Sequence, residues 1–280
     1  MVNSLCRFVA PVFFVTCLVY QYAIAQDSTT KSNQDSRQEV ENKSQSDEPK
    51  SKTSDIFDGK TLDGWSGEEG FWRVENGTII GQTTEQNRIE INSFLIWQNG
   101  TLQDFELRLK FKIDGGNSGI QFRSVDLSDH HVKGYQADID AAYNYIGILY
   151  EERGRGILAG RSKKVVIDAD GTKQESGPTC EEAKLLESLK ENEWSEYVIT
   201  AKGSHIVQQI NGFTTVDVTD HQTDKAATKG ILALQLHVGP PMTVQFKDIR
   251  LTTFDQKDAK SNAPETKDSS EDSDDSGLKP

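Results

Sequence analysis

The stretch FELRLKFKI, residues 105–113, decides the fold class, because apolar and charged side chains alternate through it without a break. A period of two places the apolar set on one face of a β-strand and the charged set on the other. The same period recurs on both sides of Asn76-Gly77 and of Asn211-Gly212. Asn-Gly accepts the positive φ angles of a tight turn, so each of these segments is predicted to be a β-hairpin.

Further strands are predicted wherever short apolar runs alternate with polar residues, and only residues 181–190 have the apolar stripe of a helix. The predicted strands cover residues 94–97, 120–123, 135–140, 146–150, 197–200, 231–238 and 244–251. Strands this frequent, with turn residues between them, predict an all-β fold, an antiparallel β-sandwich in one domain.

The negative charge of the chain argues against binding to nucleic acids and to anionic membranes. The 280 residues include 31 basic and 44 acidic side chains, for a formal net charge of −13. Nucleic acids and anionic membrane surfaces are bound through basic patches, so an acidic chain is a poor partner for either. We therefore expect no nucleic-acid partner.

The N-terminus has the layout of a secretory signal peptide. Arg7 precedes the apolar residues 8–19, and Ala23-Ile24-Ala25 forms a small-x-small cleavage site. We predict a signal peptide over residues 1–25, a secreted or periplasmic protein, and no membrane span after cleavage. An uncleaved anchor helix is the alternative, but the apolar run is short for a span of ~20 residues.

Two flanking segments lack the apolar residues that a core requires. Residues 26–54 are rich in Ser, Lys, Gln and Glu, and residues 255–280 contain an acidic cluster. We predict a disordered linker and a disordered acidic tail around a folded domain at residues 55–254. Cleavage of the leader would leave Cys180 alone, without an internal disulfide partner.

Three predicted central strands carry a polar row opposite an apolar row. The first row holds Gln121 and Arg123, the second Gln136, Asp138 and Asp140, and the third Gln235 and His237. If the strands are neighbours, these short, directional donors and acceptors share one surface. Such a surface is typical of binding or catalysis, whereas an ordinary solvent-facing sheet favours Lys, Glu and Thr.

Two loops border this surface. Residues 115–119, with the sequence GGNSG, lead into the strand that holds Gln121, and residues 150–156 follow another strand. By alternation, Glu151 leaves the side of Tyr150 and is predicted to join the polar surface.

A divalent metal is an open alternative for the cofactor. Asp138, Asp140 and His237 are chemically suitable ligands for one. The loop with Asp126, Asp129, His130 and His131 offers ligand types without a defining spacing. The sequence contains no phosphate-binding loop, dinucleotide fingerprint, nucleophile elbow or zinc-protease motif.

Several short motifs resemble, in order, those of the 3-keto-disaccharide hydrolase family. They are DIFDGK at 55–60, residues 71–81, DFEL at 104–107, NSGIQFRS at 117–124, GYQAD at 134–138, LYE at 149–151, LQLH at 234–237 and residues 244–249. Each motif alone is loose, but their order over residues 55–254 is specific.

The resemblance implies a concanavalin A-like jelly-roll sandwich that binds its ligand on the concave sheet, and carbohydrate substrates that are glycosides oxidised at C3. A C3 carbonyl acidifies the C2 hydrogen, which a carboxylate can remove before the C1 oxygen leaves. For such a substrate, Asp138 or Glu151 would be the base. Arg123 and His237 would polarise the carbonyl and the enolate.

Other polar residues of this surface are assigned to substrate binding. Gln121, Gln136 and Gln235 would orient hydroxyl groups, and Asp140, Tyr150 and Arg155 complete the predicted binding residues.

The sequence is also compatible with two other function classes. The same sandwich serves non-catalytic, lectin-like carbohydrate-binding modules, and it also serves structural domains. A conventional glycosidase with two carboxylates is a variant of the enzyme class.

Overall fold

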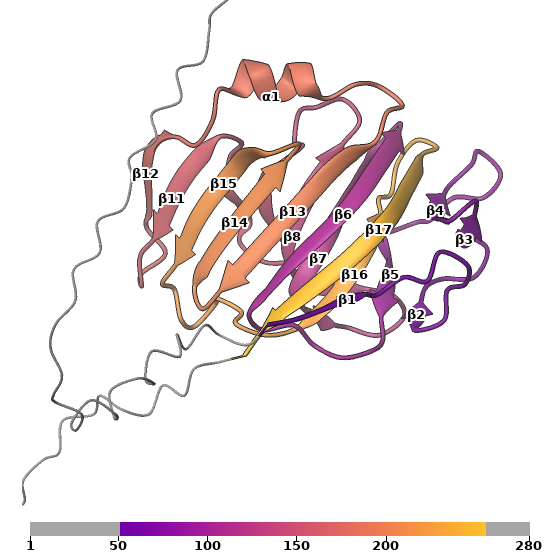
Figure 1. Cartoon of the computed structure of the whole chain (residues 1–280), viewed down its shortest axis with the longest axis horizontal. Coiled ribbons are helices and arrows are strands. Elements are labelled where there is room, and N and C mark those ends of the chain that lie inside the picture. Colours follow the sequence, from indigo (N-terminus) through magenta and orange to yellow (C-terminus); the bar gives the residue numbers. More distant parts are fainter. Residues whose placement is uncertain (1–50, 256–280) are drawn as a thin grey trace, which may run out of the picture. The chain divides into compact units, whose positions relative to one another are not determined.

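The structure is a computed structural model that describes residues 51–255, which fold into two sheets packed face to face (Figure 1). The larger sheet has the strand order β12-β11-β15-β14-β13-β6-β17-β4-β3, with β1 also paired to β17. Its strands are β1 (Ser51–Asp55), β3 (Trp72–Glu75), β4 (Thr78–Gln82), β6 (Phe105–Asp114), β11 (Lys163–Ile167), β12 (Lys173–Pro178), β13 (Ser195–Lys202), β14 (His205–Ile210), β15 (Phe213–Asp220) and β17 (Thr243–Phe254).

The smaller sheet has the order β10-β9-β8-β7-β16-β5-β2. Its strands are β2 (Trp65–Ser66), β5 (Ser93–Trp97), β7 (Asn117–Asp126), β8 (Val132–Asp140), β9 (Leu149–Glu152), β10 (Gly156–Ala159) and β16 (Ile231–Leu236). Strands far apart in sequence are neighbours in both sheets, so the predicted all-β jelly-roll sandwich is confirmed.

The core lies between the sheets and follows from the alternation of β6. Phe105, Leu107 and Leu109 are at most 1% exposed. Across the interface, the Phe105 ring packs edge-on against Phe122 of β7, with 6.0 Å between centroids. The helix α1 (Glu182–Ser188) lies within the predicted segment and contributes the buried Leu185.

Both predicted hairpin turns are confirmed. Asn76 and Gly77 have φ of 50° and 76°, and Asn211 and Gly212 have φ of 50° and 82°. These are the left-handed angles that a tight primed turn requires.

Five strands of the structure were not predicted: β1, β2, β10, β11 and β12. β1 overlaps the end of the segment predicted to be a disordered linker, because it pairs with β17 through its main chain while its side chains stay exposed and give no apolar signal. The exposed edge strand β12 was not predicted for the same reason. Strand β11 pairs parallel to β15, which is an exception to the antiparallel rule.

The predicted signal peptide, most of the predicted linker and almost all of the predicted acidic tail lie outside the described residues. Within residues 51–255, no helix is long and apolar enough to cross a membrane.

Candidate functional site

The polar rows meet on the outer face of the smaller sheet, where β8, β7 and β16 are neighbours. A pocket of about 480 Å³ opens on this face, within the range of ~300–1,000 Å³ usual for ligand sites. Its lining residues are Asn92, Asn117, Gln136, Asp138, Asp140, Asn144, Tyr145, Ile148, Tyr150, Glu152, Ile157, Gln235 and His237.

Asp138 is the most deeply placed acid of the pocket, with an exposed fraction of 5%. Asn117 Nδ2 donates to its Oδ1 at 2.7 Å, and Gln136 Nε2 donates to its Oδ2 at 3.1 Å. Burial raises the pKa of Asp138 to about 7, and the hydrogen bonds only partly offset this effect. The carboxyl group can therefore exchange a proton near neutral pH.

A chain of buried amides lies beside Asp138. Gln121 Nε2 donates to Gln136 Oε1 at 2.6 Å, and Gln136 Nε2 lies 3.3 Å from Gln235 Oε1. Gln235 Nε2 is buried and has no hydrogen-bond partner among the residues described. An unpaired buried donor is costly, so this amide is a candidate to donate to a bound ligand.

The absence of a side chain at Gly119 leaves room for the amide side chain of Gln136. Gly119 pairs with Asp138 in register, and a Cβ there would fall 2.5 Å from Cγ and Cδ of Gln136. The GGNSG segment, whose last three residues begin β7, thus contributes two features to the pocket, the Asn117 donor and the missing side chain of Gly119.

Asp140 lines the pocket, but its carboxylate oxygens accept hydrogen bonds from the backbone of the following loop. Its oxygens accept the backbone N–H groups of Ala142, Asn144 and Tyr145 at 3.2, 2.7 and 2.9 Å. These bonds hold the β8–β9 loop in place, so Asp140 supports the pocket wall at Tyr145.

The end of the β7–β8 hairpin folds over the outer face of the sheet. The β7–β8 register shifts between Phe122 and Val125. Beyond this bulge, Val132 packs against Phe94 and Ala233, which face away from the main core, and His130 O accepts the N–H of Phe94 at 3.0 Å. This end of the hairpin therefore packs against β5 and β16, and none of its residues lines the pocket.

Glu152 and His237 both line the pocket. Burial raises the pKa of Glu152, while a hydrogen bond from Asn92 and the charges of Arg153 and His237 oppose the rise. His237 Nδ1 lies 2.6 Å from Val238 O. Because a carbonyl only accepts, Nδ1 carries the proton, and Nε2 of the neutral ring is an acceptor.

Arg123 does not lie on this face, which corrects the sequence prediction. The bulge interrupts the alternation, and Arg123 has a φ of 47° and an exposed fraction of 1%. Its guanidinium donates to Gln103 O at 2.8 Å and to Gly203 O at 2.6 Å, and it pairs with Asp104 at 3.2 Å. Arg123 therefore ties two turns together and leaves the pocket without a guanidinium from β7.

Glu151 and Arg155 also lie away from the pocket. Tyr150 pairs with Gln136 in register and faces the pocket, so Glu151 faces the other way, contrary to the sequence prediction. Arg155 Nε donates to Glu151 at 2.8 Å, and its Nη2 donates to Asp220 at 2.7 Å. Tyr135 completes this buried network with a 2.6 Å bond to Asp220.

The other predicted site residues lie either in the pocket lining or directly beneath it. Gln136, Asp138, Asp140, Tyr150, Gln235 and His237 line the pocket, whereas Gln121 lies beneath it as the partner of Gln136. Further lining residues that were not predicted from the sequence include Asn92, Tyr145, Glu152 and Ile157, and no role was predicted for Asn117. Residues 150 and 152 share one face of β9. Glu152 could therefore have been predicted if it had been known that Tyr150 faces the pocket.

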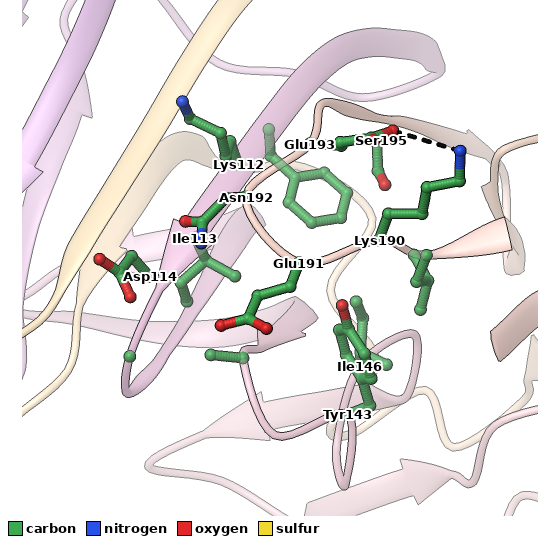
Figure 2. Close-up of a pocket in the computed structure, with 14 residues that line it drawn as sticks. Lys112, Ile113, Asp114, Tyr143, Ile146, Lys190, Glu191, Asn192, Glu193 and Ser195 are labelled. Carbon is green, nitrogen blue, oxygen red and sulfur yellow. Dashed lines mark ion pairs between the residues drawn. The ribbon is translucent and has the colours of Figure 1, made fainter. Parts of the chain in front are cut away.

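A second hollow lies on the other side of the β8–β9 loop and has only about 80 Å³. Figure 2 shows that Tyr143 and Ile146 of that loop line it together with Lys112, Asp114 and Glu191, and that Lys190 pairs with Glu193, at 3.6 Å. This volume is small for a ligand site.

Metal binding remains a prediction. Among residues 51–255, no three His, Cys, Asp or Glu side chains are grouped as a metal site would require. In the 126–131 loop, His130 contacts Ser66 Oγ at 3.3 Å and His131 contacts Asn92 O at 3.1 Å.

Comparison with solved structures finds sandwich proteins of low identity. A proposed glycosyl hydrolase from Parabacteroides distasonis is 20% identical, with a TM-score of 0.49 over 71% of this chain and 98% of that one. Carbohydrate-binding module CBM66 from Bacillus subtilis is 15% identical, with a TM-score of 0.45 over 67% and 94%. The kappa-carrageenase from Pseudoalteromonas carrageenovora is 10% identical, with a TM-score of 0.44 over 78% and 100%.

No curated protein matches the chain significantly. A family model does match it: the model of the 3-keto-alpha-glucoside-1,2-lyase-like domain covers residues 52–252, nearly the whole of the sandwich. The match confirms the resemblance seen in the motifs. The chain therefore belongs to the 3-keto-alpha-glucoside-1,2-lyase-like domain family and is a carbohydrate-active protein.

Proposed function

We propose that the pocket cleaves glycosides whose sugar is oxidised to a ketone at C3. The observation that carries this proposal is Asp138, a desolvated carboxyl group whose pKa is raised to about 7 and which two amide donors hold in the pocket. A desolvated carboxylate of raised pKa is a stronger base than an exposed one, and removal of a proton beside a ketone requires such a base.

The proposed reaction begins with proton abstraction. Asp138 takes the hydrogen from C2, and the electron pair of that bond becomes the C2–C3 enolate. When the enolate collapses, a double bond forms between C1 and C2, the bond from C1 to the leaving oxygen breaks, and that oxygen takes a proton from an acid. Addition of water across the double bond, hydroxyl to C1 and hydrogen to C2, completes net hydrolysis.

Other pocket residues suit the remaining steps. The free amide donor of Gln235 would stabilise the charge on the C3 oxygen. His237 offers an acceptor at Nε2, so it would accept a hydrogen bond from a sugar hydroxyl rather than polarise the carbonyl. Glu152 replaces Glu151 as the second carboxyl group, and its raised pKa favours the protonated form that a leaving oxygen needs.

The first experiment compares a 3-keto-glucoside with its unoxidised parent, with and without a chelator. Release of the leaving group from the keto form alone, and a primary isotope effect from deuterium at C2, are the expected results. Asp138→Asn should lower turnover at least 100-fold, whereas the matched control Asp63→Asn, at an exposed site outside the pocket, should not.

Three outcomes would contradict the proposal or extend it. Cleavage of the unoxidised parent would indicate an ordinary glycosidase, and binding without turnover would indicate a lectin-like module. Loss of turnover with chelator would add a metal to the site.

A further inference from the structure

The pocket has two chemically distinct sides. Its polar floor consists of Asn117, Gln136, Asp138 and Gln235, on β7, β8 and β16. Its apolar wall consists of Tyr145, Ile148, Tyr150 and Ile157, on the β8–β9 loop, β9 and β10.

The strand register makes this division continuous. Gln136 of the floor pairs with Tyr150, and Tyr150 pairs with Ile157 on the edge strand β10. The N–H of Asp138 also donates to Ile148 O at 3.3 Å. The apolar wall therefore begins directly beside the proposed base and continues outward to the sheet edge.

The outer part of the wall is exposed to solvent. Tyr145 is 53% exposed and Ile157 is 46% exposed, although both are large and apolar. A ligand that covered them would gain the free energy of removing apolar surface from water. The four wall side chains offer hydrogen-bonding groups only at the two tyrosine hydroxyls, so most hydroxyls of a second sugar placed there would lack partners.

We propose that the leaving group of the substrate is an apolar, ring-bearing alcohol or phenol that packs on the apolar wall while the 3-keto sugar occupies the polar floor. This inference rests on the proposed function, because it assigns the two sides of one pocket to the two halves of one substrate. The sugar hydroxyls then meet amides, and the ring meets Tyr150 and Ile157.

The test uses benzyl and methyl 3-keto-glucosides of the same anomeric configuration. Benzyl alcohol and methanol leave with similar intrinsic ease, so a difference in kcat/KM reports contact with the protein. We expect kcat/KM to be at least tenfold higher for the benzyl compound, the gain from burying ~60 Å² of apolar surface. Equal values for the two compounds would overturn the inference.

A pair of variants locates the effect. Ile157→Thr keeps the β-branch of an edge-strand residue and should lower the benzyl-to-methyl ratio several-fold. Val125→Thr is the matched control, because Val125 is also an exposed strand residue, at 56%, but lies outside the pocket lining. Its ratio should equal that of the parent protein, and equal loss in both variants would contradict a role for the wall.

Binding measurements separate this inference from the proposed function. If neither compound is cleaved, the lyase proposal fails, and the dissociation constants of the same two compounds still test the wall. Tighter binding of the benzyl compound, weakened by Ile157→Thr alone, would support the inference without catalysis. Equal dissociation constants would overturn it.

Discussion

At the scale of single residues, the most unfavourable group of the pocket is the buried carboxyl group of Asp138, because its ionisation is costly in the folded state. Asp138 is kept from water, yet only two side-chain amides compensate its charge. Its raised pKa means that the folded state holds a proton that the unfolded state releases between about pH 4 and pH 7. The folded state is therefore penalised as the pH rises through this window.

The first prediction concerns this pH dependence. The free energy of unfolding should fall from pH 5 to pH 8 by on the order of 2 kcal/mol more in the parent protein than in Asp138→Asn, which has no proton to lose. Urea denaturation at the two pH values measures the difference. Parallel pH profiles would show that the carboxyl group ionises without cost in the folded state.

The second prediction concerns the acid. Glu152→Gln cannot protonate a leaving oxygen, so cleavage of a benzyl 3-keto-glucoside should fall at least 100-fold. A 4-nitrophenyl 3-keto-glucoside needs no such proton, because its phenolate is stable, and it should be cleaved at close to the parent rate. Equal losses on both substrates would assign Glu152 to binding instead.

The sequence predicted the residues whose strands alternate regularly. Gln136, Asp138 and Gln235 lie in the pocket as the period of two requires. Arg123 was misplaced because a bulge and a positive φ cannot be read from the period. Glu151 was misplaced because the face of β9 depends on its register with β8, which is not encoded locally.

At the scale of elements, local signals were sufficient for the hairpins and for β6 but not for the register shift between β7 and β8. Asn-Gly turns and a continuous alternation act within a few residues. The folded-over hairpin end depends on contacts such as Val132 with Phe94, which join distant parts of the chain.

The third prediction tests the fit between β7 and β8. Gly119→Ala would place a Cβ 2.5 Å from the Gln136 side chain and displace the amide that holds Asp138. We expect kcat/KM for a 3-keto-glucoside to fall about tenfold, which corresponds to the loss of about 1.4 kcal/mol of transition-state stabilisation.

Gly160→Ala is the matched control, since its Cβ would meet nothing closer than Lys163 Cγ at 3.7 Å. Its kcat/KM should match that of the parent protein. If Gly119→Ala behaved like Gly160→Ala, the position of Gln136 would not matter for turnover.

At the scale of the whole molecule, the two sheets are joined by charge as well as by the core. Arg155, from the turn between β9 and β10, reaches Asp220 at the end of β15 in the larger sheet. The same guanidinium holds Glu151, and Tyr135 bonds to Asp220. Each of these groups is at least largely buried, so the network is complete only when the sheets are in contact.

The fourth prediction follows from this network. Arg155→Leu leaves Glu151 and Asp220 buried without their partner and should lower the free energy of unfolding by about 3–5 kcal/mol. Arg250→Leu removes an exposed pair with Asp55 and should cost less than about 1 kcal/mol. Urea denaturation of both variants measures the contrast, and equal costs would show that the buried pairs are not fully formed.

The pairing of β1 with β17 has a consequence for the topology of the chain. Ser51 lies opposite Phe254, so the first and last strands run side by side, as the indigo and yellow strands of Figure 1 show. The two ends of the described domain are therefore neighbours, and the strand pairing does not require the chain to begin at β1 and end at β17. A circular permutant that joins residue 254 to residue 51 through a short added turn and opens at the 168–172 turn should keep every strand pair and retain the pocket.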